Sequence, residues 1–168
     1  MVSKCNACAF FMNYCQEEYC GPIELLDRDL VAFFASRTST EDARKKALKW
    51  AEEVSHKDII VISGFHSPLE REVLDILLKN GASVIVGLGR GLYSKIPTHL
   101  QKAFDEGRVL FISFRKYSRH SFSSAQIRNW AIAQTAEKLI FAPFESGSSL
   151  DVLHQIYNDG VKSVAILD

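Results

Sequence analysis

Six short runs of apolar residues recur along the chain, and each one ends in small or polar residues. They cover residues 30–35, 58–63, 83–87, 109–114, 139–142 and 163–167. Between them lie segments with apolar residues at helical spacing, over about 41–55, 68–80, 97–106 and 124–135 and from 150 onward. Continuous apolar strands that alternate with helices are typical of a parallel sheet covered on both faces. The pattern therefore predicts a Rossmann-like, doubly wound α/β fold with a mostly parallel sheet of about six strands.

A chain of 168 residues has the length of one domain, and its pattern changes only near the N-terminus. Residues 1–28 are expected to form an irregular or partly helical lead-in, broken at Gly21 and Pro22. No linker rich in proline or serine interrupts residues 29–168, so this part is expected to form the Rossmann-like domain.

The formal charge of the chain balances, with 20 basic and 20 acidic residues. Contact with nucleic acid would therefore need a local basic patch. Hydrophobic residues make up 47% of the chain, as in a soluble globular protein, and no apolar run approaches the roughly 20 residues that cross a bilayer. The N-terminus lacks the apolar core and cleavage site of a signal peptide. We therefore expect a cytoplasmic protein without a membrane partner.

All four cysteines, Cys5, Cys8, Cys15 and Cys20, lie within the lead-in. In a reducing cytosol, clustered cysteines serve more often as metal ligands or free thiols than as disulfides. Cys5 and Cys8 have the spacing of one half of a tetrahedral thiolate site, whereas four residues separate Cys15 from Cys20. The sequence leaves two interpretations open: a zinc or iron–sulfur site, or a terminal segment with free thiols.

Glycines, hydroxyl side chains and basic side chains follow four of the predicted strands, at the end where parallel sheets bind ligands. Arginine can form bidentate hydrogen bonds with phosphate, and glycine lets backbone N–H groups approach it. We therefore expect these ends and the predicted helix 124–135 to form one phosphate-binding site, with Arg115, Lys116 and Arg119 extending a basic rim. The candidate ligand-binding residues are Ser36, Arg37, Thr38, Ser63, Gly64, His66, Ser67, Gly89, Arg90, Gly91, Arg128, Asn129, Ser146, Gly147 and Ser148.

The loop from Glu145 to Ser149 is the best candidate for the phosphate seat itself. It lies between a predicted strand and a predicted helix, and a helix N-terminus attracts anions because its N–H groups are unpaired. The alternative is that this loop is only a capped helix start, with Ser148 or Ser149 as the N-cap residue.

Catalytic candidates are few. Glu70 and Glu145 are weak candidates for an acid or base. Neither the Gly-x-Gly-x-x-Gly fingerprint nor a phosphate-binding P-loop sequence is present, so no motif supports a dinucleotide- or ATP-dependent enzyme.

The order of these motifs, from about Leu30 to Leu167, resembles the Rossmann-like domain of the DNA-processing protein A (DprA/Smf) family. The likeness rests on residues 35–39, residues 62–65, residues 81–92, and the pair formed by residues 127–133 and 145–150. One departure is Trp130, which stands where a second arginine is usual. The family lies within the SLOG superfamily of nucleotide-binding proteins, which also includes lysine-decarboxylase-like (LOG) phosphoribohydrolases that activate cytokinins.

The resemblance implies a protein that binds single-stranded DNA or a nucleotide at the carboxyl ends of the strands and that acts in DNA processing or uptake. It also implies a homodimer. The alternative is an enzyme of the phosphoribohydrolase type that binds or hydrolyses a small nucleotide. In the phosphoribohydrolase signature a glutamate follows the glycines, whereas Glu145 precedes Gly147. We therefore favour binding over catalysis.

Overall fold

The computed structural model describes residues 17–114, 122–158, 160 and 162–168. Six strands and five helices lie close to their predicted bounds, and a short strand and a 3-10 helix precede them. The elements are β1 (Glu18–Cys20), η1 (Ile23–Asp27), β2 (Leu30–Phe34), α2 (Glu41–Val54), β3 (Ile60–Ser63), α3 (Pro68–Lys79), β4 (Val84–Leu88), α4 (Thr98–Asp105), β5 (Val109–Ser113), α5 (Phe122–Thr135), β6 (Lys138–Phe141), α6 (Ser149–Tyr157) and β7 (Ser163–Ile166).

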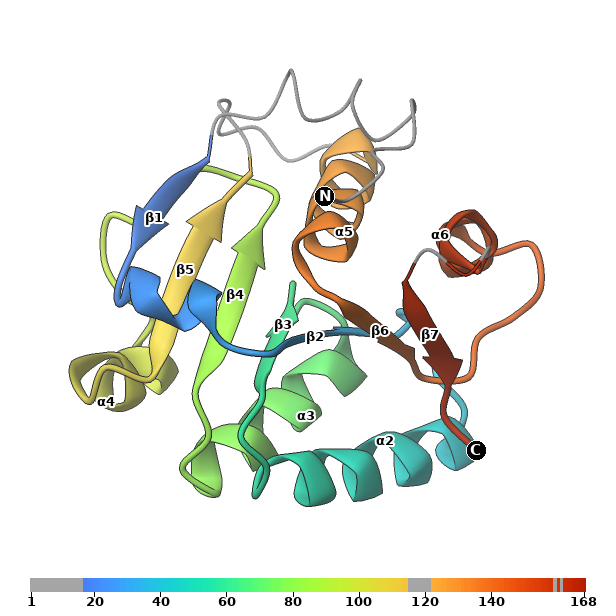
Figure 1. Ribbon diagram of the computed structural model, residues 1–168, viewed down its shortest axis with the longest axis horizontal. Helices are drawn as coiled ribbons and strands as arrows, with labels where there is room; N and C mark the ends of the chain where they lie inside the picture. The colour runs from blue at the N-terminus through green and yellow to red at the C-terminus, as the bar shows by residue number, and fades with distance from the viewer. Residues whose placement is uncertain (1–16, 115–121, 159, 161) are drawn as a thin grey trace.

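One sheet contains every described strand, in the order β1-β5-β4-β3-β2-β6-β7 (Figure 1). All neighbours pair in parallel except β1 and β5, which are antiparallel. From β2 the chain adds β3, β4 and β5 on one side and then returns to add β6 and β7 on the other. The strand order therefore reverses between β2 and β6, where Ala32 lies opposite Leu139. We call the carboxyl ends of these two strands the switch point, the place where open α/β sheets commonly bind ligands.

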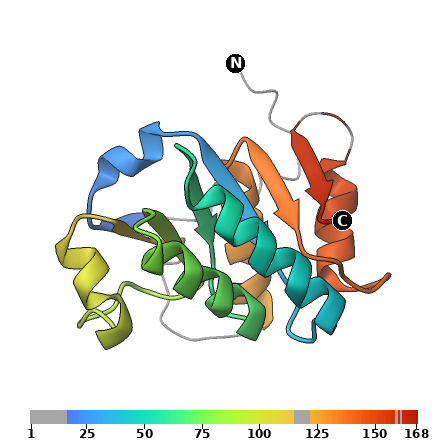
Figure 2. The same cartoon turned by 90° about the horizontal axis from the view of Figure 1, so that it is seen from below.

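Two layers of helices cover the sheet and confirm the predicted doubly wound fold (Figures 1 and 2). Helices α2, α3 and α4 pack on one face, and α5 and α6 pack on the other. Side chains of each strand alternate between these two cores. In β2, Val31 and Phe33 belong to the first core, whereas Ala32 and Phe34 belong to the second. Both faces are apolar, and this accounts for the continuous apolar runs in the sequence.

The structure places part of the expected lead-in within the sheet. Strand β1 covers the outer edge of β5, with Tyr19 opposite Ile112. Leu25 of η1 is buried in the same core as α5 and α6. The sequence analysis missed β1 because Glu18–Cys20 is short and contains no apolar run.

The predicted metal site is only partly within the described residues. Cys5, Cys8 and Cys15 lie outside them, and Cys20 is a half-buried free thiol in β1. Within the described ranges, no three His, Cys, Asp or Glu side chains are grouped as metal ligands. The metal site therefore stays a prediction. No helix in the described part of the chain is long and apolar enough to span a membrane.

Helix α5 is held at its C-terminal end by a lysine that is distant in sequence. Lys162 Nζ donates hydrogen bonds to the carbonyl oxygens of Ala133, Gln134 and Ala136, at 2.7, 2.8 and 2.6 Å. These carbonyls lie in or just after the last turn of the helix, where backbone acceptors are unpaired and a positive charge is favourable. These hydrogen bonds hold the C-terminal end of α5 in place beside the sheet.

We expect the substitution Lys162→Met to lower the free energy of unfolding by about 1–3 kcal/mol, because it removes the charged donor from these carbonyls. Urea unfolding followed by circular dichroism measures the change. Lys49→Met is the matched control, because Lys49 is exposed on α2. Equal stability of the two variants would contradict the capping role of Lys162.

Candidate functional site

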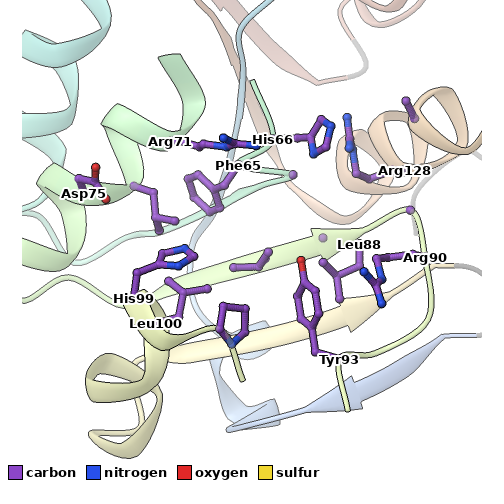
Figure 3. A pocket seen from close by; sticks show the side chains of 17 residues that line it. Phe65, His66, Arg71, Asp75, Leu88, Arg90, Tyr93, His99, Leu100 and Arg128 are labelled. Carbon is purple, nitrogen blue, oxygen red and sulfur yellow. The ribbon is translucent and has the colours of Figure 1, made fainter. Parts of the chain in front are cut away.

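A cavity of about 750 Å³ lies beside the carboxyl ends of β3 and β4 (Figure 3). Helix α3 forms one wall, the connection 89–97 and the start of α4 form another, and α5 closes one end. The lining residues are Gly64, Phe65, His66, Arg71, Leu74, Asp75, Val86, Gly87, Leu88, Gly89, Arg90, Tyr93, Pro97, His99, Leu100, Ala125 and Arg128.

The cavity brings together five of the candidates that the sequence analysis named: Gly64, His66, Gly89, Arg90 and Arg128. They come from the loop after β3, the loop after β4, and α5. The other candidates do not line it: Ser36, Arg37, Thr38, Ser63, Ser67, Gly91, Asn129, Ser146, Gly147 and Ser148. The predicted rim residues Arg115, Lys116 and Arg119 lie outside the described residues. The cavity thus joins two of the four strand ends with α5 and lies to one side of the switch point.

Two of the candidate glycines make room for α5. A Cβ atom on Gly64 would lie 2.6 Å from Nε of Arg128, and one on Gly89 would lie 2.9 Å from the carbonyl oxygen of Ser124. Such distances are too short for real contacts, so any side chain at either position would displace the helix or the arginine. We had expected these glycines to let backbone N–H groups approach a phosphate. In the structure they allow α5 to pack closely on the strand ends.

Arg128 is a buried cation at the end of the cavity. Its side chain comes from α5, only 8% of the residue is exposed, and Figure 3 shows its guanidinium turned toward His66. Burial lowers the pKa of the guanidinium, and the negative charge of Glu70 partly opposes this effect. Among the described residues, its hydrogen bond goes from Nε to Oδ1 of Asn129, at 3.2 Å. The remaining guanidinium donors are available to a ligand in the cavity.

The carboxylate of Glu70 is occupied by backbone N–H groups. Its Oε1 accepts hydrogen bonds from the backbone nitrogens of His66 and Ser67, both at 3.1 Å, and its Oε2 accepts one from Ala35 at 3.3 Å. The Ser67 hydroxyl in turn accepts a bond from the Glu70 nitrogen and completes a capping box at the start of α3. Glu70 therefore ties the loop after β2 to the loop after β3 and does not line the cavity.

The wall beside Glu70 contains a strained residue. Phe65 has a φ of 46°, and it is the non-glycine residue with positive φ in the described chain. The Ser63 hydroxyl accepts a hydrogen bond from its backbone nitrogen at 3.2 Å. Its ring is buried and lines the cavity. Strain of this kind is concentrated at functional sites, because the surrounding structure must hold it.

Arg90 is positioned by an aromatic side chain. Its guanidinium carbon lies 4.8 Å from the ring centroid of Tyr93, in a cation–π contact. The edge of Tyr93 packs on Phe111 of β5, with ring centroids 5.7 Å apart. A guanidinium over a ring face keeps the N–H donors at its edge free, so Arg90 can still bind an anion.

The loop after β6, expected to seat a phosphate, is capped by its own helix. Ser148 is the N-cap of α6 and accepts a hydrogen bond from the Asp151 nitrogen, as the alternative interpretation predicted. Oδ2 of Asp151 accepts a hydrogen bond of 2.7 Å from the Gly147 nitrogen. Bonds from the Gly147 nitrogen and from Gln155 hold the pKa of Asp151 below its usual value. A carboxylate of the chain thus occupies the place expected for a phosphate oxygen.

The other side of the switch point presents an exposed arginine. The Ser36 hydroxyl donates to the carbonyl oxygen of Thr38 at 3.0 Å, so this hydroxyl stabilises its own loop. Arg37 is exposed between these two residues. It faces solvent at the carboxyl end of β2, two strands from β4.

Sequence reasoning missed several lining residues, above all Arg71, Asp75, Tyr93 and His99. None of them belongs to a recognisable motif. Two weak signals existed: Arg71 and Asp75 are one helical turn apart on α3, and residues 89–97 form an unusually long connection between a strand and a helix. Long connections at this edge of a sheet often bind ligands.

The family model of DNA recombination-mediator protein A matches residues 18–156. The chain belongs to this family. The match includes β1, the cavity and the Arg128 helix, and it confirms the resemblance found in the motifs. No curated protein matches the chain significantly.

Solved structures of related proteins have the same fold. DNA processing protein A from Streptococcus pneumoniae gives a TM-score of 0.73 with 20% identity over 94% of this chain. The protein from Helicobacter pylori, whose binding mode for single-stranded DNA is known, gives 0.72 with 18% identity over 89%. A molybdenum cofactor carrier protein from Chlamydomonas reinhardtii gives 0.55 with 13% identity, over 83% of this chain and 76% of that one. The chain spans 58% of the Streptococcus protein and 70% of the Helicobacter protein.

In this member of the DNA-processing family, we expect the substitution Arg128→Met to change the free energy of unfolding by no more than about 1 kcal/mol, or to increase it. Methionine fills the space of the arginine stem and removes a buried charge, while Glu70 keeps its three backbone donors. Urea unfolding measures the effect. A loss of about 3 kcal/mol or more would show that the guanidinium stabilises the fold as one partner of an ion pair.

We expect Gly89→Ala to lower the free energy of unfolding by about 1–3 kcal/mol, because its Cβ would meet the Ser124 carbonyl oxygen. Gly91→Ala, two residues further on, should change it by less than about 0.5 kcal/mol, since nothing lies within 4 Å of a Cβ there. Thermal unfolding of the two variants, side by side, makes the comparison. Equal effects would contradict the close packing of α5 on the loop after β4.

Proposed function

We propose that this chain binds single-stranded DNA in DNA processing, with the cavity at β3 and β4 as the anchoring point. The observation that carries the proposal is the excess of positive charge in the cavity. Among the described residues, its lining contains three arginines, Arg71, Arg90 and Arg128, and one carboxylate, that of Asp75. An anionic ligand is the natural complement of such a lining.

The burial of Arg128 strengthens this argument. A buried guanidinium without a carboxylate partner is unfavourable unless another anion neutralises it. Among the described residues, no ion pair joins Arg128 to an acidic side chain. Phosphate is an anion that arginine binds well, because the planar fork of donors matches two of its oxygens.

A basic site of this kind agrees with the balanced charge of the whole chain. Because 20 acidic residues offset 20 basic ones, affinity for DNA must come from a local cluster. The exposed Arg37 at the switch point could extend that cluster along the carboxyl ends of the strands. The Helicobacter pylori relative binds single-stranded DNA with the same fold, and this supports the choice of ligand.

The geometry favours binding over catalysis. Glu70 is buried and bonded to three backbone nitrogens, and Glu145 is exposed outside the cavity lining. Neither carboxylate lines the cavity. The homodimer and the cytoplasmic location expected from the sequence stay predictions.

We expect the chain to bind a fluorescent oligothymidylate with an affinity that falls as salt rises, with a slope of log affinity against log salt of about −0.7 per phosphate contacted. Arg90→Gln should weaken binding about three- to fivefold and reduce the slope by about 0.7, because it removes one exposed phosphate contact. Fluorescence anisotropy at several salt concentrations measures both quantities.

Arg28→Gln is the matched control for this experiment. Arg28 is also exposed but lies just before β2, at the opposite edge of the sheet, where it pairs with Asp58. Its substitution should change neither the affinity nor the slope. Absence of binding at low salt would refute the proposed function. Equal effects of Arg90→Gln and Arg28→Gln would show that the cavity is not where the DNA binds.

A further inference from the structure

We propose that the cavity recognises a phosphate monoester of a nucleotide, and that it therefore selects a terminal phosphate of a single strand over the phosphodiesters of its interior. The inference rests on the proposed function and names the part of the DNA that enters the cavity. A free nucleoside 5′-monophosphate carries the same chemical group, so the experiment below separates the two sources.

The first argument is the amount of charge. Among the described lining residues, three arginines against one carboxylate leave an excess of two positive charges. Asp75 lies at the α3 end of the cavity, away from Arg128 and Arg90 (Figure 3). A phosphodiester inside a strand brings one negative charge, whereas a terminal phosphate monoester brings about 1.5 to 2 at neutral pH. The monoester balances the cavity more fully.

The second argument is access to the buried guanidinium. Arg128 is 8% exposed, and its side chain packs from α5 against Gly64 and Gly89. An internal phosphodiester has two free oxygens and chain on both sides, so both strand connections must pass beside a guanidinium whose residue is only 8% exposed. A terminal phosphate has three free oxygens and one ester link. It can therefore reach Arg128 while its sugar and base remain behind it in the cavity.

The third argument is the polarity of the cavity along its length. Arg128 and His66 lie at the end formed by α5, and Leu88 and Arg90 lie near the end of β4 (Figure 3). The opposite end, toward α4, includes the apolar side chain of Leu100, with Asp75 and His99 as polar groups beside it. This arrangement matches a nucleotide, whose phosphate is anionic and whose base combines a planar apolar face with hydrogen-bonding edges.

The size of the cavity is consistent with one nucleotide. A volume of about 750 Å³ lies within the range of roughly 300–1,000 Å³ found for sites of small ligands. The ring of Tyr93, held by Phe111 on one side and Arg90 on the other, forms part of the wall between the two ends. The terminal nucleotide would fill the cavity while the rest of the strand runs outward along the carboxyl ends of the strands.

The test compares one oligothymidylate sequence carrying a 5′-phosphate, a 5′-hydroxyl, or a 3′-phosphate with a 5′-hydroxyl. We expect each phosphorylated strand to bind about tenfold more tightly than the strand without a terminal phosphate at equal salt. Arg128→Met should remove this preference, and Arg28→Met, which deletes a distant exposed arginine, should keep it. The unfolding curves of both variants establish that they are folded.

A second arm tests the free nucleotide. Thymidine 5′-monophosphate should displace the labelled 5′-phosphorylated strand and raise the melting temperature of the wild-type protein, whereas thymidine should do neither. Arg128→Met should show no such rise. Because the thermal shift does not depend on DNA binding, it reports on the cavity even where no strand binds.

The outcomes separate this inference from the proposed function. Equal affinity for all three strands would overturn the inference and leave single-stranded DNA binding intact. A preference for a terminal phosphate that persists in Arg128→Met would also overturn it. Stabilisation by thymidine monophosphate without binding of any strand would support monoester recognition and refute the proposed function. No response to any strand or nucleotide would overturn both.

Discussion

The burial of Arg128 against the glycine-bearing ends of β3 and β4 is the constraint on which the site depends. Helix α5 approaches the sheet so closely that Gly64 and Gly89 have no room for a side chain. This packing removes water from the guanidinium and lowers its pKa, and no acidic side chain of the described residues forms an ion pair with it. A cation held in this way by the core of the domain cannot move to solvent, so the cavity in front of it is suited to an anion.

The network around Glu70 makes this arrangement rigid. Its carboxylate joins the loops after β2 and β3 through backbone N–H groups, and it supports the strained backbone beside Phe65. The same carboxylate attracts Arg128 only from a distance, since its oxygens are already bonded to Ala35, His66 and Ser67. The positive charge of the cavity is thus preserved because the nearest buried acid has a structural role.

Sequence reasoning found the elements and five of the residues that line the cavity, but it did not predict the packing role of two of them. Gly64 and Gly89, expected to contact phosphate, make room for the Arg128 side chain and the Ser124 carbonyl of α5. The loop from Ser146 to Ser148 was expected to seat an anion, and Asp151 occupies that place. Both differences have one cause: a glycine or a helix N-terminus looks the same in sequence whether its partner is a ligand or another part of the chain.

The sequence by itself determined the alternation of strands and helices, the buried parallel sheet and the family, because periodicity, caps and motifs are local properties. Only the tertiary structure decided the strand order, the edge position of β1, and the cavity at β3 and β4 in place of the switch point. It also brought Arg71 and Tyr93 to the same cavity as Arg128. These features depend on how closely α5 packs on the strand ends and on contacts between residues far apart in the chain, which no local pattern records.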